Sequence, residues 1–314
     1  MKINNKNGCI YVLAGRLYMI EECIERFYDY YNAKFNFPFY IYYFDNLFDK
    51  NKKNIKIAKK LSQKYKIKFV NIKTSIPNNV SYKDLFFNKD YSYVKKSFGP
   101  ERINYLHMCH FFTNTNNKPE LDKYRFHHRI DDDVFLQKNI DDNLFEVMNS
   151  QNYKLATSKL WNQIKPSTYD TRQCLFEFYK SYLRKNNLIP LNAHLEQAVN
   201  LDNEDLFHKL HWSTGHFNIY DQKYLKDHPN WNAYIDYVNS SGGIYKYRWG
   251  DFELIGLFLY TFFENPKLDL KLDLDGYMTA YSKGTKVLTT DNFLQFYLKK
   301  IYRKLRYQIL TKLD

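Results

Sequence analysis

The sequence predicts an α/β domain in which a parallel sheet is covered by helices. Segments typical of buried strands alternate with segments of helical periodicity along the first 72 residues, in the order strand, helix, strand, helix, strand. Neither an internal repeat nor a flexible linker interrupts the 314 residues, so we expect one continuous folding unit. Polar residues follow the predicted strands, at the edge where sheets of this kind bind their ligands.

The first five elements follow from the spacing of apolar residues. Short apolar or aromatic runs that stop at small or polar residues predict strands, and apolar residues three and four positions apart predict helices. They are a strand over 9–15, a helix over 18–34, a strand over 37–44, a lysine-rich helix over 53–65 and a strand over 66–72. Arg16 and Asp45 therefore follow two neighbouring strands, and we expect them at the same edge of the sheet.

The same patterns continue in the remainder of the chain. The later predictions are helices over 101–115, 171–185 and 252–263, and strands over 123–130 and 155–160. Two further stretches, 203–218 and 242–251, are rich in motifs. The strand over 123–130 is the most informative of these, because three acidic residues follow it directly.

Composition narrows the class of protein. A hydrophobic content of 44% with 19% aromatic residues excludes a disordered chain. The four cysteines are widely spaced and form no C-x-x-C pair, so we expect reduced thiols. The sequence contains no apolar run of about 18 residues and no signal-peptide core, so we expect a soluble and most simply cytoplasmic protein. The net charge of +13 comes from lysines scattered along the chain without a recognition motif, which argues against a nucleic-acid partner.

Asp131, Asp132 and Asp133 form the most concentrated acidic segment of this basic chain. Adjacent carboxylates repel one another and are tolerated mainly where water or a cation offsets their charge. Carboxylate oxygens are the ligands that Mg²⁺ and Mn²⁺ prefer, and these ions commonly share their coordination sphere with diphosphate oxygens. The triplet alone is consistent with a metal site and equally with a solvated turn that caps a helix.

Four stretches carry specific motifs: FNFPF at 35–39, YLHMCHFF at 105–112, RIDDDV at 129–134 and GGIYKYRWGD at 242–251. They are similar to F-N-Y-P-W, Y-R-H-M-C-R-F, R-V-E-P-D-V and G-G-F-F-Y-E-R-W-G-D of the fungal α-1,2-mannosyltransferases, glycosyltransferase family 15. Their order and approximate spacing also agree. The resemblance covers about residues 9–280, and the second and fourth stretches are its most specific part.

The resemblance implies a GT-A fold with a single catalytic domain over 1–290. A nucleotide-sugar half over about 1–136 would join an acceptor half over about 137–290. The implied reaction transfers mannose from GDP-mannose, with retention and in α-1,2 linkage, to a hydroxyl of a glycan, glycolipid or glycoprotein. Another sugar nucleotide is an alternative donor. The implied cofactor is Mn²⁺ or Mg²⁺, since a cation that bridges the leaving diphosphate to acidic residues stabilises the charge that develops there.

By motif, Asp131 and Asp133 match the acidic residues of the family's metal site, whereas Asp132 replaces a proline and is expected to be the spare acid. The implied donor-binding residues are Arg16, Asp45, Arg129, Asp131, Arg248 and Trp249. The implied catalytic residues are Tyr105, His216 and Asp251, of which Asp251 is the candidate base or acceptor contact. A surface salt bridge for Arg16, and a structural pair of Arg248 with Asp251, are the alternatives.

Two departures from the family pattern affect the chemistry. His216 falls where the family has a Glu proposed as nucleophile, and a glycosyl-imidazolium would be an unusual covalent intermediate. The chain would then use front-face chemistry, in which the leaving phosphate takes the acceptor proton, or another carboxylate, unless the alignment is displaced by one or two residues. The nearby carboxylates are Glu204, Asp205, Asp221 and Glu253. The family's metal-binding histidine also has no counterpart in 272–279, where Asp273 or Asp275 is either a substitute ligand or a turn residue.

The last 24 residues, 291–314, are predicted to form a basic amphipathic helix. It would dock its apolar stripe on the domain or make peripheral contact with an anionic membrane. For the chain as a whole, a catalytically inactive homologue that binds glycans or acts as a scaffold is the alternative to an enzyme. The sequence does not predict the oligomeric state.

Overall fold

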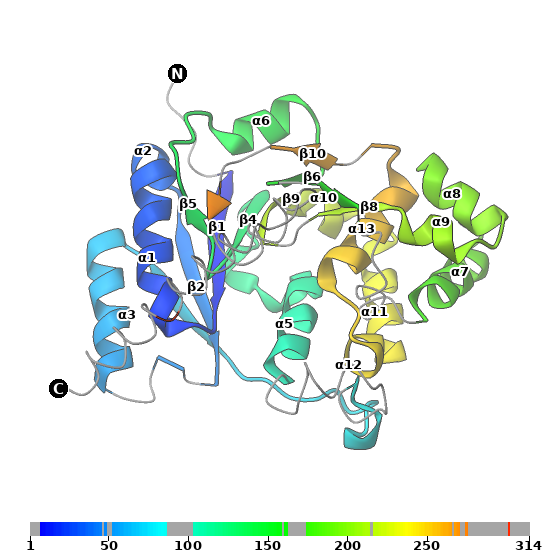
Figure 1. The fold of residues 1–314 in the computed structure, drawn as a ribbon, viewed down its shortest axis with the longest axis horizontal. Helices are drawn as coiled ribbons and strands as arrows, with labels where there is room; N and C mark the ends of the chain where they lie inside the picture. The colour runs from blue at the N-terminus through cyan, green and yellow to red at the C-terminus, as the bar shows by residue number, and fades with distance from the viewer. Residues whose placement is uncertain are drawn as a thin grey trace.

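The computed structural model describes residues 7–45, 47–48, 52–86, 103–158, 160–162, 174–213, 216–265, 267–270, 274–275 and 301. Its centre is a mixed sheet whose strands lie side by side in the order β10 (Lys267–Asp269), β6 (Leu155–Thr157), β9 (Phe217–Asp221), β4 (Phe126–Asp131), β1 (Gly8–Ala14), β2 (Phe39–Phe44) and β3 (Lys68–Ile72) (Figure 1). From β4 to β3 the strands are parallel, as the sequence predicts, whereas β9 runs antiparallel to both of its neighbours. Two small ribbons accompany this sheet, β5 (Phe135–Leu136) with β11 (Leu274–Asp275) and β7 (Leu160–Asn162) with β8 (His211–Ser213).

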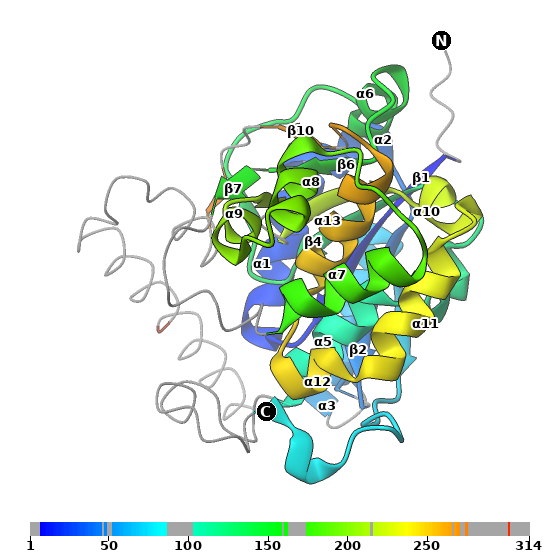
Figure 2. The same cartoon turned by 90° about the vertical axis from the view of Figure 1, so that its right-hand side faces the viewer.

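Helices cover both faces of the sheet (Figures 1 and 2). On one face lie α1 (Leu17–Phe27), a π-helical segment (Tyr28–Asn32), α2 (Ala33–Phe35) and α3 (Lys52–Tyr65). On the other lie α5 (Ile103–Thr113), α11 (Trp231–Ser241), α12 (Gly243–Tyr247) and α13 (Asp251–Phe262), with α7 (Leu175–Lys185), α8 (Ala193–Asn200) and α9 (Glu204–His208) beyond them. The remaining helices are α6 (Leu144–Ser150) and α10 (Gln222–Asp227), with single 3₁₀ turns at Tyr82–Asp84, Thr115–Asn117 and Pro119–Leu121.

Most of the predicted elements are present, with shifted boundaries. The helix predicted over 18–34 is α1, the π-helical segment and α2, and the strand predicted over 123–130 begins three residues later, as β4. The strand predicted over 155–160 is wrong, because β6 and β7 pair in different sheets. Residues 101–102 and 171–173, and the helix predicted over 291–314 apart from Ile301, lie outside the described residues.

Side chains of β1 alternate between two cores, which fixes the register of the sheet. Ile10 and Val12 pack in the core beneath α1, whereas Cys9 and Tyr11 pack in the core beneath α5. A third core fills the space among α5, α7, α11 and α13. Within the described part of the chain, no helix combines the length and apolar composition needed to cross a bilayer.

His128 is buried in the core beneath α1 and makes the stability of the fold sensitive to acid. Its ring is inaccessible to solvent, lies 4.3 Å from the ring of Phe217, and has no hydrogen-bond partner at either nitrogen. Burial lowers the pKa of His128 to about 3. The unfolded chain therefore binds a proton near pH 6.5 that the folded chain binds only near pH 3, so this residue lowers stability as the pH falls through that interval.

We expect His128→Leu to reduce the acid sensitivity of folding. Between pH 7 and pH 4 the wild type should lose about 3 kcal/mol of unfolding free energy at this site, and the variant should not lose that share. Urea unfolding at both pH values measures the difference, with His194→Leu on the exposed side of α8 as the matched control. Equal pH dependence in the wild type and His128→Leu would contradict the assignment.

Candidate active site

The carboxyl ends of β1, β2 and β4 meet at one edge of the sheet, as predicted. Leu13 of β1 is in register with Asp131, the last residue of β4. Arg16 follows β1, Asp45 follows β2, and His216 immediately precedes the antiparallel β9, so all of them reach this edge. The topology therefore gathers residues that are up to 200 positions apart in the sequence, since 216 − 16 = 200.

Asp132 holds the loop between β1 and α1. Its Oδ2 accepts hydrogen bonds from the backbone N–H groups of Gly15 and Arg16, both at 2.6 Å, and its Oδ1 accepts one from Arg16 Nε at 2.6 Å. Arg16 Nη1 donates to Asp133 Oδ2 at 2.6 Å. Both carboxylates are buried, whereas the Arg16 side chain is 39% exposed. Asp132, which was expected to be the spare acid of the metal site, therefore has a structural role that the motif did not indicate.

The charge of Arg16 is held by these partners. Partial burial acts to lower the pKa of Arg16, but Asp132 and Asp133 outweigh that effect and keep the pKa above its usual range. The Arg16 guanidinium is therefore a permanent cation on the partly exposed side of the site. The alternative of a simple surface salt bridge does not describe it, because both partners are buried.

Arg129 connects the end of β4 to the start of α13. Its guanidinium pairs with Asp251 and lies 3.2 Å from Asp131 Oδ1, and it stacks 3.4 Å above the ring of Phe112. Burial acts to lower the pKa of Arg129, but Asp251 and Asp131 outweigh it and hold the pKa above its usual range. Burial raises the pKa of Asp251, and Arg129 opposes that rise. Asp251 therefore pairs with Arg129, and the alternative of a structural pair with Arg248 is not what the structure shows.

The motif over 242–251 forms a tight corner beside this network. Arg248 has a left-handed backbone (φ 61°), and its guanidinium lies 4.8 Å from the ring of Tyr105. Trp249 is 1% exposed and packs 4.5 Å from the ring of Phe178. Trp249 is therefore a core residue and presents almost no exposed face to a donor. Burial raises the pKa of Tyr105, so its phenol is protonated and can donate a hydrogen bond.

His216 is fully buried, and its Nε2 lies 3.1 Å from Ser158 Oγ. Its backbone carbonyl accepts a hydrogen bond from the N–H of Asp131 at 2.9 Å. This arrangement places the residue beneath Asp131, where it supports the strand end. Ser158 was not identified from the sequence. It directly follows β6, and a polar residue that follows a strand at this edge is the signal that could have identified it.

Asp45 lies exposed after β2, with a left-handed backbone. It accepts hydrogen bonds from Thr74, at 3.3 Å from the backbone N–H and 2.8 Å from the hydroxyl. Thr74 follows β3 at the same edge and was also missed. Asp45 is therefore accessible to a ligand on the β2 and β3 side of the site.

The alternative carboxylates proposed to replace the family's Glu have different surroundings. Asp221 ends β9 at the opposite edge of the sheet, where its Oδ2 lies 3.0 Å from Arg125 Nη2. Glu204 is largely exposed on α9, 3.5 Å from His208 Nε2. Glu253 is fully buried in the first turn of α13. Asp221 therefore cannot act at the same edge as Asp131.

A metal ion would find oxygen ligands here but no complete protein cage. Among the described residues, no group of three or more His, Cys, Asp or Glu side chains could hold a metal ion. Asp131 is the member of the triplet with the more accessible side chain, at 18% exposure, and Asp133 lies beside Arg16. Mg²⁺-type ions are often held by one or two carboxylates together with substrate phosphates, and this donor set fits that mode.

One of the two predicted substitute ligands, Asp275, lies on a short strand that returns to the triplet. Asp275 of β11 is in register with Phe135, two residues after Asp133. Asp273 lies outside the described residues. The backbone pairing therefore brings this segment beside the acidic triplet.

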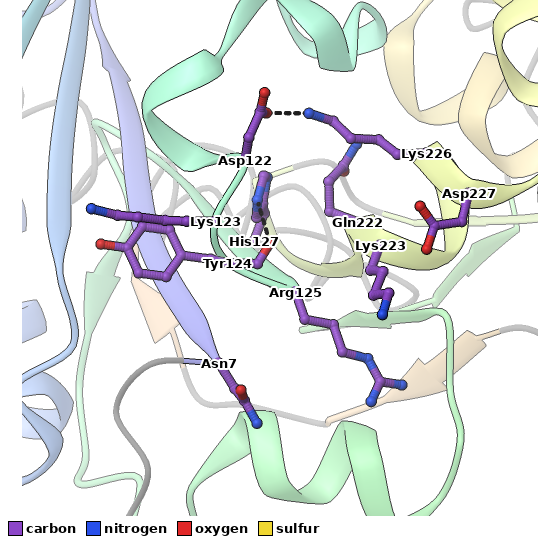
Figure 3. Close-up of a pocket in the computed structure, with 10 residues that line it drawn as sticks. All are labelled: Asn7, Asp122, Lys123, Tyr124, Arg125, His127, Gln222, Lys223, Lys226 and Asp227. Atoms are coloured by element: carbon purple, nitrogen blue, oxygen red, sulfur yellow. Dashed lines mark hydrogen bonds and ion pairs between the residues drawn. The ribbon is translucent and has the colours of Figure 1, made fainter.

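A basic pocket lies at the opposite end of the sheet from this site (Figure 3). It is lined by Asn7, Asp122, Lys123, Tyr124, Arg125, His127, Gln222, Lys223, Lys226 and Asp227. Lys226 pairs with Asp122, as the dashed line in Figure 3 shows, and Arg125 pairs with Asp221. Because Asn7 precedes β1 and Arg125 precedes β4, this pocket is separated from Asp131 by the length of the strands.

Comparisons with known proteins agree with the fold and the motifs. A family model described as glycolipid 2-alpha-mannosyltransferase matches residues 2–283. The chain is 27% identical over 249 residues to alpha-1,2 mannosyltransferase KTR1 of Saccharomyces cerevisiae, which covers 75% of this chain and 58% of that relative. The chain thus spans little more than half the length of this relative.

Two solved structures share the architecture. The mannosyltransferase Ktr4p from S. cerevisiae superposes with a TM-score of 0.68 at 20% identity, over 88% of this chain and 72% of that one. Core-mannan synthase A from Aspergillus fumigatus, in its Mn/GDP form, gives a TM-score of 0.63 at 19% identity, over 81% and 70% of the two chains. These similarities confirm the GT-A fold that the sequence predicts.

Proposed function

The chain belongs to the glycolipid 2-alpha-mannosyltransferase family, and on that premise we propose that it is a retaining, metal-dependent glycosyltransferase. The donor we propose is GDP-mannose, and the product is an α-1,2 linkage to a glycan, glycolipid or glycoprotein hydroxyl. The Mn/GDP form of the A. fumigatus structure supports the choice of nucleotide and metal. The domain limits of 1–290, with halves meeting near residue 136, are part of this proposal.

The observation that carries the proposal is that Arg16 and Asp131 lie at the same carboxyl edge of the sheet, after β1 and at the end of β4. Arg16 is a half-exposed, permanent cation that can attract diphosphate oxygens and bind them through the N–H groups that Asp132 and Asp133 leave available. Asp131 and Asp133 would hold Mn²⁺ or Mg²⁺, which when bound neutralises charge on the leaving diphosphate. Asp45, which follows β2 at the same edge, and Arg248, beside Tyr105, would also contact the donor.

For the transfer itself we favour front-face chemistry. The bond between the anomeric carbon and the diphosphate oxygen breaks, the acceptor oxygen bonds to the same face of that carbon, and the leaving phosphate takes the acceptor proton. His216 is buried against Ser158 and is thus a poor nucleophile. Tyr105 can donate a hydrogen bond to a substrate. The buried Asp251 pairs with Arg129, and Arg129 in turn contacts Asp131 and holds it in place.

A donor screen tests this function. GDP-mannose, GDP-fucose, UDP-galactose, UDP-glucose and UDP-N-acetylglucosamine are offered with and without Mn²⁺, and released nucleotide is measured. We expect slow hydrolysis of GDP-mannose that requires Mn²⁺. Turnover of another donor would change the sugar and keep the reaction class, whereas nucleotide binding without turnover of any donor would favour an inactive, glycan-binding homologue.

A further inference from the structure

The loop between β1 and α1 is capped by a residue that lies far away in the sequence but follows the neighbouring strand β4. Arg16 is the N-cap residue of α1, and its own side chain makes no capping hydrogen bond. The backbone N–H groups of Gly15 and Arg16 donate instead to Oδ2 of Asp132, which lies 116 positions beyond Arg16. A buried carboxylate that accepts two backbone N–H groups fixes the position of the loop relative to β4.

The second oxygen of the same carboxylate fixes the side chain of Arg16. Asp132 Oδ1 lies 2.6 Å from Nε and 2.5 Å from Nη2, and Asp133 Oδ2 lies 2.6 Å from Nη1. Two of the five guanidinium N–H groups donate hydrogen bonds in this way, from Nε and Nη1, and Nη2 lies within ion-pair distance of Asp132. Because the side chain is 39% exposed, the guanidinium keeps N–H groups that a ligand can reach.

We propose that Asp132 is a positioning residue that presets Arg16 for the diphosphate of the sugar nucleotide. The inference rests on the proposed function and adds to it a residue that acts only through Arg16. An arginine that is already ordered loses less conformational freedom when it binds an anion, so part of the donor affinity is assigned to Asp132. A proline, which stands at this position in the family motif that the chain resembles, has no carboxylate with which to do this.

A purely structural role of Asp132 predicts different effects on stability and on nucleotide affinity. If Asp132 only capped α1, its replacement would lower stability and leave the affinity for nucleotide unchanged. Asp132→Asn separates the two roles, because the amide keeps the size of the side chain and one oxygen for the backbone N–H groups but loses the charge that orients Arg16.

The test is calorimetric titration of GDP in the presence of Mn²⁺, with donor KM and kcat measured in parallel. We expect Asp132→Asn to raise the Kd for GDP about 10- to 100-fold, by analogy with other residues that orient a direct ligand, and to raise KM more than it lowers kcat. In an Arg16→Ala background, Asp132→Asn should cause no further loss of GDP affinity, because its effect passes through Arg16. Asp142→Asn, at an exposed loop position, is the matched control and should bind GDP as the wild type does.

The outcomes distinguish this inference from the proposed function. A wild-type protein that binds no GDP would overturn both. If the wild type binds GDP and Asp132→Asn binds it equally well, or if the loss persists undiminished in the Arg16→Ala background, only the positioning role of Asp132 is overturned. Thermal unfolding of each variant identifies a loss of affinity that comes merely from unfolded protein.

Discussion

Replacing Arg129 with methionine is expected to lower the free energy of unfolding by about 3 to 5 kcal/mol. Arg129 is 2% exposed, and it pairs with Asp251, which is 1% exposed. Removing the cation leaves the Asp251 carboxylate buried without its partner, and the cost comes mainly from that uncompensated charge. Urea unfolding of the wild type and Arg129→Met at pH 7 measures the difference.

The double variant Arg129→Met, Asp251→Asn is the internal control. It removes both charges, so it should recover part of the loss, because a neutral amide is much less costly to bury than an unpaired carboxylate. Arg129→Met should also release Asp131, whose Oδ1 lies 3.2 Å from Arg129 Nη2. If the single and double variants are equally unstable, the loss comes from packing against Phe112 instead.

Strand ends were predictable from the sequence because polar residues interrupt apolar runs there. Asp45 stops the run that becomes β2, and Asp131 ends β4, so their meeting at one edge followed from the parallel topology alone. His216 also lies at this edge, but the pattern of apolar residues could not predict that position. β9 runs antiparallel, which places its first residues, rather than its last, beside Asp131.

The partners of the charged residues could not be predicted in the same way. Arg129 pairs with Asp251, 122 positions away, because α13 begins beside the end of β4. The motif suggested Arg248 as the partner of Asp251, since the two are close in sequence. In the structure the guanidinium of Arg248 lies 4.8 Å from the ring of Tyr105.

Asp132 shows how a family pattern can mislead when a residue type changes. Because the motif has a proline at this position, comparison by motif assigned Asp132 no role. Physical chemistry gives the opposite expectation, since a carboxylate that is 1% exposed needs several donors to remain charged. Gly15 and Arg16 supply those donors, but their approach depends on the pairing of β1 with β4.

The largest effect on activity is expected from Asp131→Asn. Asp131 is the triplet member with the more accessible carboxylate, so it is the residue that would hold the metal against the donor diphosphate. An amide of the same size keeps an oxygen for Arg129 but removes the negative charge. We expect the rate of GDP release from GDP-mannose to fall at least 100- to 1,000-fold, roughly the range seen when one stabilising group is lost from a transition state.

Two controls separate loss of chemistry from loss of fold. Asp131 is partly exposed and keeps its place at the end of β4, so Asp131→Asn should unfold at a temperature close to that of the wild type. EDTA should abolish wild-type turnover, and added Mn²⁺ should restore it in the wild type but not in the variant. Wild-type rates in Asp131→Asn, or turnover that is insensitive to EDTA, would mean that neither Asp131 nor a divalent metal stabilises the leaving diphosphate.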